Sequence, residues 1–286
     1  SGGTLKLSRG LTGTWSAVGE SSSDYFGGRI ASAGDVNADG YDDVIIGASA
    51  APGPGNGTGE VYVYYGSATG LASSAAWNVN GEAAGDRFGY SVASAGDVNG
   101  DGYADVIVGA NYNDGGGAEA GEAYVYHGSS SGLSTSPDWS YQGEAATDSY
   151  GQNVASAGDV NGDGYADIIV GANGNDGGGS AAGEAYVYHG SASGLSASPD
   201  WSDQGEAAGD GFGNSVASAG DVNGDGYADV IVGAASNDDA GSNAGQAYVY
   251  SFAVTLVPAW ETWSAQGEAV DDTFGSVASA GDVNGD

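Results

Sequence analysis

The feature that most constrains this chain is an internal repeat with a period of 62 residues. A tryptophan, a glutamate and an aspartate keep this spacing along the 286 residues. They are Trp15, Trp77, Trp139, Trp201 and Trp263; Glu20, Glu82, Glu144, Glu206 and Glu268; and Asp24, Asp86, Asp148, Asp210 and Asp272. One unit of this length cannot bury its apolar faces alone, so we expect successive units to stack on one another.

Each unit contains four strand-like runs bounded by clusters of Gly, Ser, Asn and Asp. In the second unit these runs span 90–95, 104–110, 122–128 and 138–144. The second run is continuously apolar at its centre, as expected for a strand covered on both faces. The third alternates, which places its tyrosines on one face and Ala123 and Val125 on the other. No window has a convincing 3.6-residue period, so the chain is predicted to be all-β.

Four short strands at a long fixed period are typical of a β-propeller blade. We therefore predict one domain over 1–286, with four complete four-stranded blades and a split or truncated fifth. The predicted segments are a partial blade at 1–20, blades at about 21–82, 83–144, 145–206 and 207–268, and a partial blade at 269–286. The aromatic residues Phe88, Tyr124 and Trp139, with their equivalents, are expected to fill the cores between blades.

The composition excludes several classes of function. The net charge is −34, and Lys6, Arg9, Arg29 and Arg87 are the only basic side chains. Such a surface cannot neutralise a nucleic acid or an anionic membrane, so neither is an expected partner. Without cysteine there is no disulfide, zinc–thiolate site or thiol catalysis. The absence of methionine, even at position 1, favours a processed or trimmed chain.

An acidic motif of nine residues, D-x-N-x-D-G-x-x-D, recurs in four units. It places oxygen-bearing side chains at positions 1, 3, 5 and 9 and a glycine at position 6, as at the start of a calcium loop. With the backbone carbonyl of position 7, the candidate ligands are Asp35, Asn37, Asp39, Tyr41 and Asp43; Asp97, Asn99, Asp101, Tyr103 and Asp105; Asp159, Asn161, Asp163, Tyr165 and Asp167; and Asp221, Asn223, Asp225, Tyr227 and Asp229. The prediction is about one Ca²⁺ per complete loop.

The motif differs from an EF-hand in its second half. Position 12 is Val108 or an equivalent apolar strand residue, where an EF-hand has a bidentate glutamate. The alternative interpretation is a set of Asx turns without metal. A fifth motif contributes Asp282, Asn284 and Asp286 before the sequence stops, and we expect its remainder to come from a longer chain or a neighbouring one.

The residues resemble the FG-GAP repeat. The similarity rests on Phe88-Gly89, the D-x-N-x-D-G-x-x-D loop and the following VIVGA run, and it extends over essentially the whole chain. FG-GAP repeats form the propeller blades of integrin α chains and of many microbial surface proteins. The resemblance implies that each loop joins the first two strands of a blade and holds Ca²⁺.

Other acidic and basic side chains are weaker candidates. The pair Glu82 and Asp86 recurs in every unit, which favours turn chemistry over catalysis. His127 and His189 occupy equivalent positions that hold Tyr65 and Ser251 in other units, so we expect an exposed strand end there. Asn56 begins the only N-glycosylation sequon.

These observations favour a non-catalytic, calcium-stabilised extracellular surface protein that acts in adhesion or structural assembly. A protein or glycan ligand on a loop face is the expected partner, with self-assembly as a further option. One alternative is a propeller module of a secreted carbohydrate- or lipid-active enzyme. Another is a subunit of a self-assembling extracellular fibre.

Overall fold

A computed structural model of the chain describes residues 15–53, 55–239 and 242–252. All of them belong to one compact unit, Ser1–Ala253, which is distinct from Val254–Asp286. The described residues form strands and loops without a helix, as the sequence predicts. In this part of the chain there is accordingly no helix long and apolar enough to cross a membrane.

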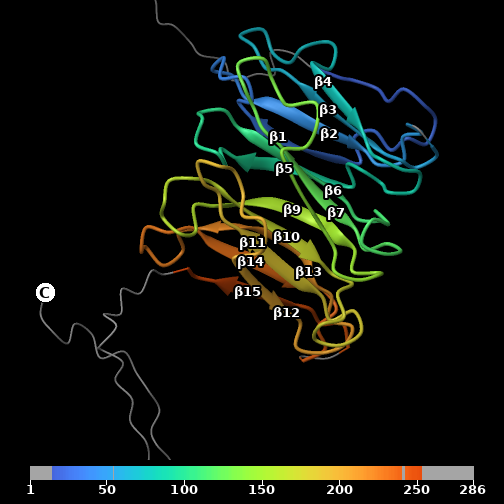
Figure 1. Ribbon diagram of the computed structural model, residues 1–286, viewed down its shortest axis with the longest axis vertical. Helices are drawn as coiled ribbons and strands as arrows, with labels where there is room; N and C mark the ends of the chain where they lie inside the picture. Colours follow the sequence, from blue (N-terminus) through green and yellow to red (C-terminus); the bar gives the residue numbers. More distant parts are fainter. Residues whose placement is uncertain (1–14, 54, 240–241, 253–286) are drawn as a thin grey trace, which may run out of the picture. The chain divides into compact units, whose positions relative to one another are not determined.

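The strands form successive antiparallel sheets, each built from one repeat in a simple meander (Figure 1). The first sheet contains β1 (Arg29–Gly34), β2 (Asp43–Ala48), β3 (Glu60–Tyr64) and β4 (Trp77–Asn80). The second contains β5 (Ser91–Gly96), β6 (Asp105–Ala110), β7 (Glu122–Tyr126) and β8 (Trp139–Gln142). The third contains β9 (Tyr150–Gly158), β10 (Asp167–Ala172), β11 (Glu184–Tyr188) and β12 (Trp201–Gln204). The last contains β13 (Phe212–Gly220), β14 (Asp229–Ala234) and β15 (Gln246–Tyr250).

This arrangement confirms the prediction of four-stranded, propeller-type blades for the first three repeats. The last sheet shows three strands because the expected fourth, around Trp263, lies outside the described residues. The predicted partial fifth blade at 269–286 also lies outside them, as does most of the partial blade at 1–20.

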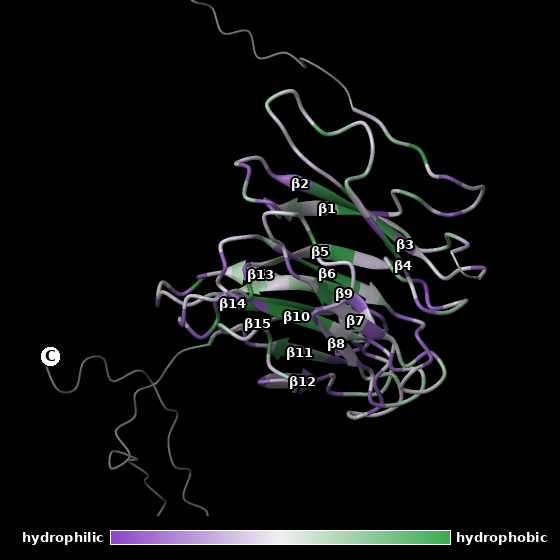
Figure 2. Ribbon diagram, turned by 45° about the horizontal axis from the view of Figure 1, so that its top comes forward, coloured by the Kyte–Doolittle hydropathy of each residue, from purple (hydrophilic) through white to green (hydrophobic). Residues whose placement is uncertain are grey.

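A hydrophobic core fills each space between neighbouring sheets. Between the first two sheets, this core combines Ile45, Val61 and Val63 with Val106, Val108, Tyr124 and Tyr126. The alternate residues Ile107, Ala123 and Val125 contribute to the next core, together with residues of the third sheet. The alternation predicted for the third strand and the double burial predicted for the second are both confirmed. Figure 2 shows hydrophobic colouring on central strands such as β6 and β10, with more polar loops around them.

Aromatic pairs connect the end of one repeat with the next. The Trp77 ring meets that of Tyr126 edge-on, with ring centroids 5.1 Å apart, and its indole N–H donates to the carbonyl of Ser134 at 2.9 Å. Within the second repeat, Phe88 meets Tyr124 in a similar edge-on arrangement at 5.4 Å. The tryptophan pair recurs in Trp15–Tyr64, Trp139–Tyr188 and Trp201–Tyr250. The aromatic residues thus fill the cores between sheets, as predicted.

The first strands of consecutive sheets also contact one another. In the second repeat this strand reads SVASAG, a run of small side chains. Because small residues let backbones approach closely, the sheets can converge along these strands. The first strands therefore lie where neighbouring sheets approach one another.

Candidate metal site

Each acidic motif forms the loop between the first and second strands of a sheet. The loops span 35–42, 97–104, 159–166 and 221–228, and the final aspartate of each motif is the first residue of the next strand. The structure therefore places the four complete sets of predicted ligands in equivalent loops. The incomplete fifth set, Asp282, Asn284 and Asp286, lies outside the described residues.

Within each loop, the acidic side chains accept backbone hydrogen bonds. In the second loop, Asp97 Oδ1 accepts the N–H of Asp101 at 3.1 Å, and its Oδ2 accepts that of Gly102 at 2.8 Å. Asn99 Oδ1 accepts the N–H of Asp101 at 3.0 Å, and Asp101 Oδ1 accepts that of Tyr103 at 3.1 Å. The same bonds of the first motif residue recur in the other three loops. These are Asx turns, and they bring the residues at positions 1, 3 and 5 into one tight bend.

The glycine at position 6 is required by the backbone. Gly102 has a φ of 88°, and its equivalents Gly40, Gly164 and Gly226 have φ values of 91°, 90° and 92°. This left-handed region is costly for residues with a Cβ. The motif glycine therefore permits the bend, as the calcium-loop interpretation requires.

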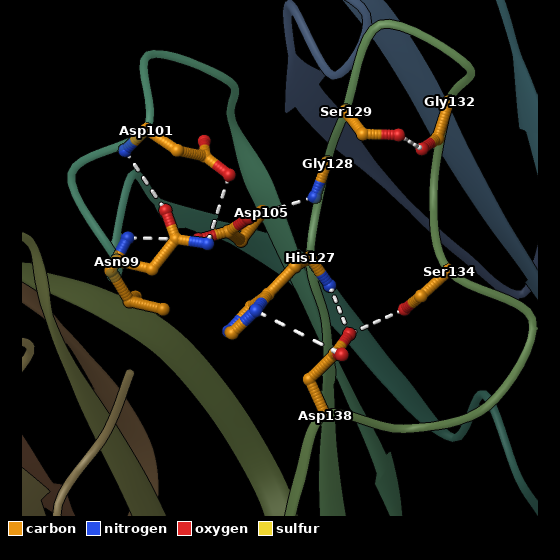
Figure 3. A network of polar contacts seen from close by, with 10 residues as sticks. Asn99, Asp101, Asp105, His127, Gly128, Ser129, Gly132, Ser134 and Asp138 are labelled. Carbon is orange, nitrogen blue, oxygen red and sulfur yellow. Dashed lines mark hydrogen bonds and ion pairs between the residues drawn. The ribbon is translucent and has the colours of Figure 1, made fainter. Parts of the chain in front are cut away.

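The aspartate at position 9 connects the loop to the rest of its sheet. Asp105 is fully buried. Its Oδ2 accepts the N–H of Val98 at 2.8 Å, and its Oδ1 accepts the N–H of Gly128, in the loop after β7, also at 2.8 Å (Figure 3). Asp43 and Asp167 make the same two bonds. The partner from the loop after the third strand is not evident in the sequence, because it lies 23 residues away.

The environment of Asp105 disfavours its negative charge. Burial raises the pKa of this carboxyl to about 6, the hydrogen bonds from Gly128 and Val98 oppose that rise, and the charge of Asp101 adds to it. Burial also raises the pKa of the equivalent Asp167 to about 6. A carboxylate that is buried beside other carboxylates is stabilised in its ionised form by a nearby cation. The loop is therefore electrostatically suited to one.

The residues present fit a hard cation by their chemistry. All the candidate donors are carboxylate, amide or backbone oxygens, which suit Ca²⁺ and Mg²⁺ and not softer metals. In the last described loop, Asp229 Oδ1 is buried and has no hydrogen-bond partner in the described part of the chain. However, no group of three or more His, Cys, Asp or Glu side chains in the described residues is arranged to hold an ion. The loop side chains are instead hydrogen-bonded to one another, as Asn99 Nδ2 donates to Asp101 Oδ2 at 3.0 Å.

Consecutive loops are joined directly. The N–H of Ala104 donates to the carbonyl of Asp35, the first residue of the preceding loop, at 3.0 Å. The same bond joins Ala166 to Asp97 at 3.0 Å and Ala228 to Asp159 at 2.9 Å. The backbone at position 1 of each of these loops is thus hydrogen-bonded to the loop that follows it.

In the recurrent acidic pair before each first strand, the aspartate stabilises a turn. Asp86 is buried, and its Oδ2 accepts the N–H of Ala83 at 2.8 Å. Asp148 and Asp210 accept the N–H groups of Ala145 and Ala207 in the same way. Glu82, in contrast, is exposed. This difference supports a structural role for the repeated aspartate.

The histidines are less exposed than the sequence predicts. Only 21% of the His127 side chain is accessible, and its Nδ1 lies 3.9 Å from Asp138 Oδ1 (Figure 3). His189 has the same relationship with Asp200 at 3.8 Å. The prediction of an exposed strand end is wrong because Gly194, in the corresponding loop of the next sheet, lies close to the His127 ring. This contact depends on how the sheets stack.

Comparison with known families identifies the repeat. The model of the FG-GAP repeat matches residues 26–64, 88–126, 150–188 and 212–250, which together make up more than half of the chain. The chain belongs to the FG-GAP repeat family. Each matched stretch runs from the aromatic residue of the F-G pair, through the acidic loop, to the end of the third strand. The FG-GAP unit therefore includes the whole candidate metal loop.

The FG-GAP chain is also similar to integrin α chains. It is 36% identical to human integrin alpha-6 over 126 residues, which is 42% of this chain and 10% of the relative. It is 38% identical over 139 residues to integrin alpha-3 of Cricetulus griseus, covering 48% of this chain and 12% of the relative. For integrin alpha pat-2 of Caenorhabditis briggsae the identity is 40% over 126 residues, with shares of 40% and 10%. The match thus spans about a tenth of the length of these relatives.

Proposed function

We propose that this FG-GAP protein is a non-catalytic, calcium-stabilised extracellular module that acts in adhesion or structural assembly. The observation that carries the proposal is the set of four equivalent acidic loops, each closed by a buried aspartate. The similarity to integrin α chains supports the extracellular setting. Its partner would be a protein or glycan held on a loop face, or another copy of the chain.

Calcium would be held by the side chains at positions 1, 3, 5 and 9 and the carbonyl at position 7 of each loop. Bound there, the ion would neutralise carboxylates that otherwise repel one another. The chain's own contribution is to hold these groups together: the position-9 aspartate ties the loop to the second strand, and backbone bonds tie each loop to the next. Extracellular calcium modules have dissociation constants of about 10⁻⁴–10⁻³ M, which suits a role outside the cell.

The effect on stability would be large. At a free calcium concentration ten times the dissociation constant, one site adds about 1.4 kcal/mol to the free energy of unfolding. Four independent sites would add about 6 kcal/mol, comparable with the whole stability of many domains, roughly 5–15 kcal/mol. The folded module would then be stable in a calcium-rich compartment and much less stable in a calcium-poor one.

The test of the metal is a thermal unfolding experiment with calcium, with magnesium and with EGTA. We expect calcium to raise the melting temperature by about 10 °C or more and native mass spectrometry to detect about four bound ions. Magnesium should have a smaller effect, since it requires tighter octahedral geometry. An identical melting curve in calcium and in EGTA would contradict the proposal.

The adhesive role is tested separately with coated beads. Beads that carry the whole chain should bind cells, matrix or one another in calcium and release in EGTA. The control chain has the first aspartate of each complete loop replaced by asparagine. Calcium-dependent stabilisation without any adhesion or self-association would leave the metal proposal in place and exclude the adhesive one.

A further inference from the structure

An open hollow of about 670 Å³ lies at the loops that follow the second strands of the first two sheets. The candidate metal loops precede those strands, so the hollow is at their opposite ends. Its lining includes Tyr25, Asn56, Arg87, Tyr90 and Tyr112. The volume is within the usual range for small-molecule sites, about 300–1,000 Å³.

The side chains that line the hollow are those that depart from the repeat. Tyr25 and Arg87 occupy the same repeat position, whose other occupants are Ser149, Gly211 and Thr273. At the position of Tyr90 the other repeats have Gly28, Gln152 and Asn214, and at that of Tyr112 they have Ala50, Gly174 and Ser236. The acidic loops and the second and third strands are nearly identical from repeat to repeat. Large side chains at these positions are therefore not needed to build a blade.

Two of these residues also adopt a strained backbone conformation. The φ values of Tyr25 and Arg87 are 57° and 59°, in the left-handed region. The equivalent Ser149 and Gly211 have 55° and 63°, so the conformation belongs to the repeat position. Glycine adopts it freely, whereas a bulky side chain does so at a cost. Strain that a simpler residue would avoid is typical of functional sites.

One arginine, Arg87, lines the hollow, and a second, Arg29, lies against the ring of its lining residue Tyr90. The Arg87 guanidinium carbon lies 3.9 Å from the centre of the Tyr112 ring, and that of Arg29 lies 5.2 Å from the centre of the Tyr90 ring. Neither arginine has an acidic side chain within ion-pair distance among the described residues. Although the chain has 38 Asp and Glu residues, none of them lines this hollow.

The neighbouring carboxylate does not neutralise Arg87. Asp86 is 4% exposed and accepts the N–H of Ala83 at 2.8 Å. A second pocket, beside the first sheet, is instead lined by Glu20, Asp24 and Glu60. The two pockets therefore differ in charge, and only the first is suited to an anion.

We propose that this hollow binds an acidic sugar, one whose ring carries a carboxylate or sulfate group. Tyrosine rings present flat faces with a polar edge, which suits the face of a pyranose. An arginine with free N–H groups pairs with an anionic oxygen group through charge-assisted hydrogen bonds, and Asn56 offers an amide that can donate and accept. The inference rests on the proposed adhesive role and specifies its ligand class.

The experiment measures binding of the whole calcium-loaded chain, made without glycosylation at Asn56, to an array of oligosaccharides. The array carries uronate-containing and sialylated sugars, sulfated sugars, carboxyl-reduced or desulfated counterparts, and aspartate-containing peptides. We expect binding to at least one acidic sugar and about tenfold or greater weakening for its neutral counterpart. Comparing the carboxylated sugars with the sulfated sugars shows which of the two anionic groups the hollow recognises. Binding to no acidic sugar, or to the peptides alone, would overturn the proposal.

The variants use residues that the repeat itself accepts. Arg87→Ser installs the residue of the third repeat, and Tyr112→Ser that of the fourth, so both chains should fold. Each should weaken binding about tenfold or more while the calcium-dependent melting temperature is retained. The matched control, Ser149→Arg, adds a guanidinium where the tyrosines are absent and should create no second site.

Unchanged binding in both Arg87→Ser and Tyr112→Ser would show that the sugar does not bind in this hollow. Failure of this proposal is distinguishable from failure of the proposed function. A chain that is stabilised by calcium and adheres through another surface, yet binds no acidic sugar, contradicts the sugar site alone.

Discussion

Gly109, at the end of β6, packs directly against the carbonyl oxygen of Gly151 in the next repeat, so that a Cβ at position 109 would overlap it. Gly109 belongs to the G-A pair of its repeat, and Gly151 belongs to the pair at the F-G position of the next, where Tyr150 replaces the phenylalanine. Gly47 and Gly89 have the same relationship, as do Gly171 and Gly213. The two most recognisable dipeptides of the motif therefore meet at the sheet interface, where only glycine permits the approach.

Replacing Gly109 with alanine should destabilise the protein by about 2–3 kcal/mol, because the added methyl group forces two sheets apart. The comparison is Ser91→Ala, which acts on the same carbonyl by removing the hydrogen bond from Ser91 Oγ to the oxygen of Gly151, 2.7 Å long. That change should cost only about 1 kcal/mol. Urea unfolding measures both. Equal effects would show that the close approach is not the constraint at position 109.

Replacing a loop aspartate with asparagine should affect stability differently at position 9 and at position 1. In Asp105→Asn, an amide N–H would face the N–H of Val98 or Gly128, so about 2 kcal/mol should be lost with or without calcium. Asp97→Asn also places an amide N–H against a backbone N–H, but this residue is half-buried and water can solvate the displaced groups, so the loss should appear chiefly in calcium. Thermal unfolding in calcium and in EGTA separates the two. A calcium-dependent loss of the same size in both variants would contradict the anchoring role of Asp105.

The stability of the calcium-free protein should increase on mild acidification. Burial is the first cause of the raised pKa values of Asp86, Asp148, Asp105 and Asp167, and it takes the last two to about 6. A carboxyl whose pKa is higher in the folded than in the unfolded state stabilises the fold below the unfolded pKa, and this contribution is lost as the pH rises through the folded one. The melting temperature in EGTA should therefore rise between pH 7 and about pH 5.

Calcium supplies the control for this pH profile. The ion favours the ionised loop carboxylates, so acidification should weaken its binding and reduce or reverse the rise. Asp24 opposes the trend, because the hydrogen bond from the N–H of Ser21 lowers the pKa of its carboxyl. The stability that this bond contributes is lost only at pH values near and below the ordinary pKa of 3.8. A melting temperature that falls steadily below pH 7 in EGTA would show that the buried carboxylates do not govern stability.

Removing the strained side chain of Tyr25 should stabilise the fold. The residue is 67% exposed and has a φ of 57°, so its ring contributes little packing while its Cβ incurs strain. Tyr25→Gly should raise the free energy of unfolding by about 1 kcal/mol. Tyr25→Ala is the matched control, since it removes the ring but keeps the Cβ, and it should give no such gain. Equal stabilisation in both variants would attribute the effect to the ring and not to the backbone.

The period, the strands and the acidic loops could be predicted from the sequence alone. These features depend on neighbours close along the chain: the alternation at Tyr124 and Val125 assigns the faces of β7, and the aspartates and glycine of 97–102 specify a tight turn. Repetition strengthens each such prediction, because the same local pattern occurs in several units. The strand limits observed in the second repeat accordingly all lie within two residues of the predicted ones.

The contacts between repeats, in contrast, depend on how the sheets pack. The partial burial of His127, the bond from Gly128 to Asp105 and the close approach of Gly109 to Gly151 involve residues separated along the chain. The hollow between Tyr25 and Tyr112 likewise combines loops of two repeats, although departures from the repeat could have marked its residues in the sequence. A sequence pattern specifies which face of a strand is apolar. Only the packing of the sheets determines which backbones touch and which side chains converge.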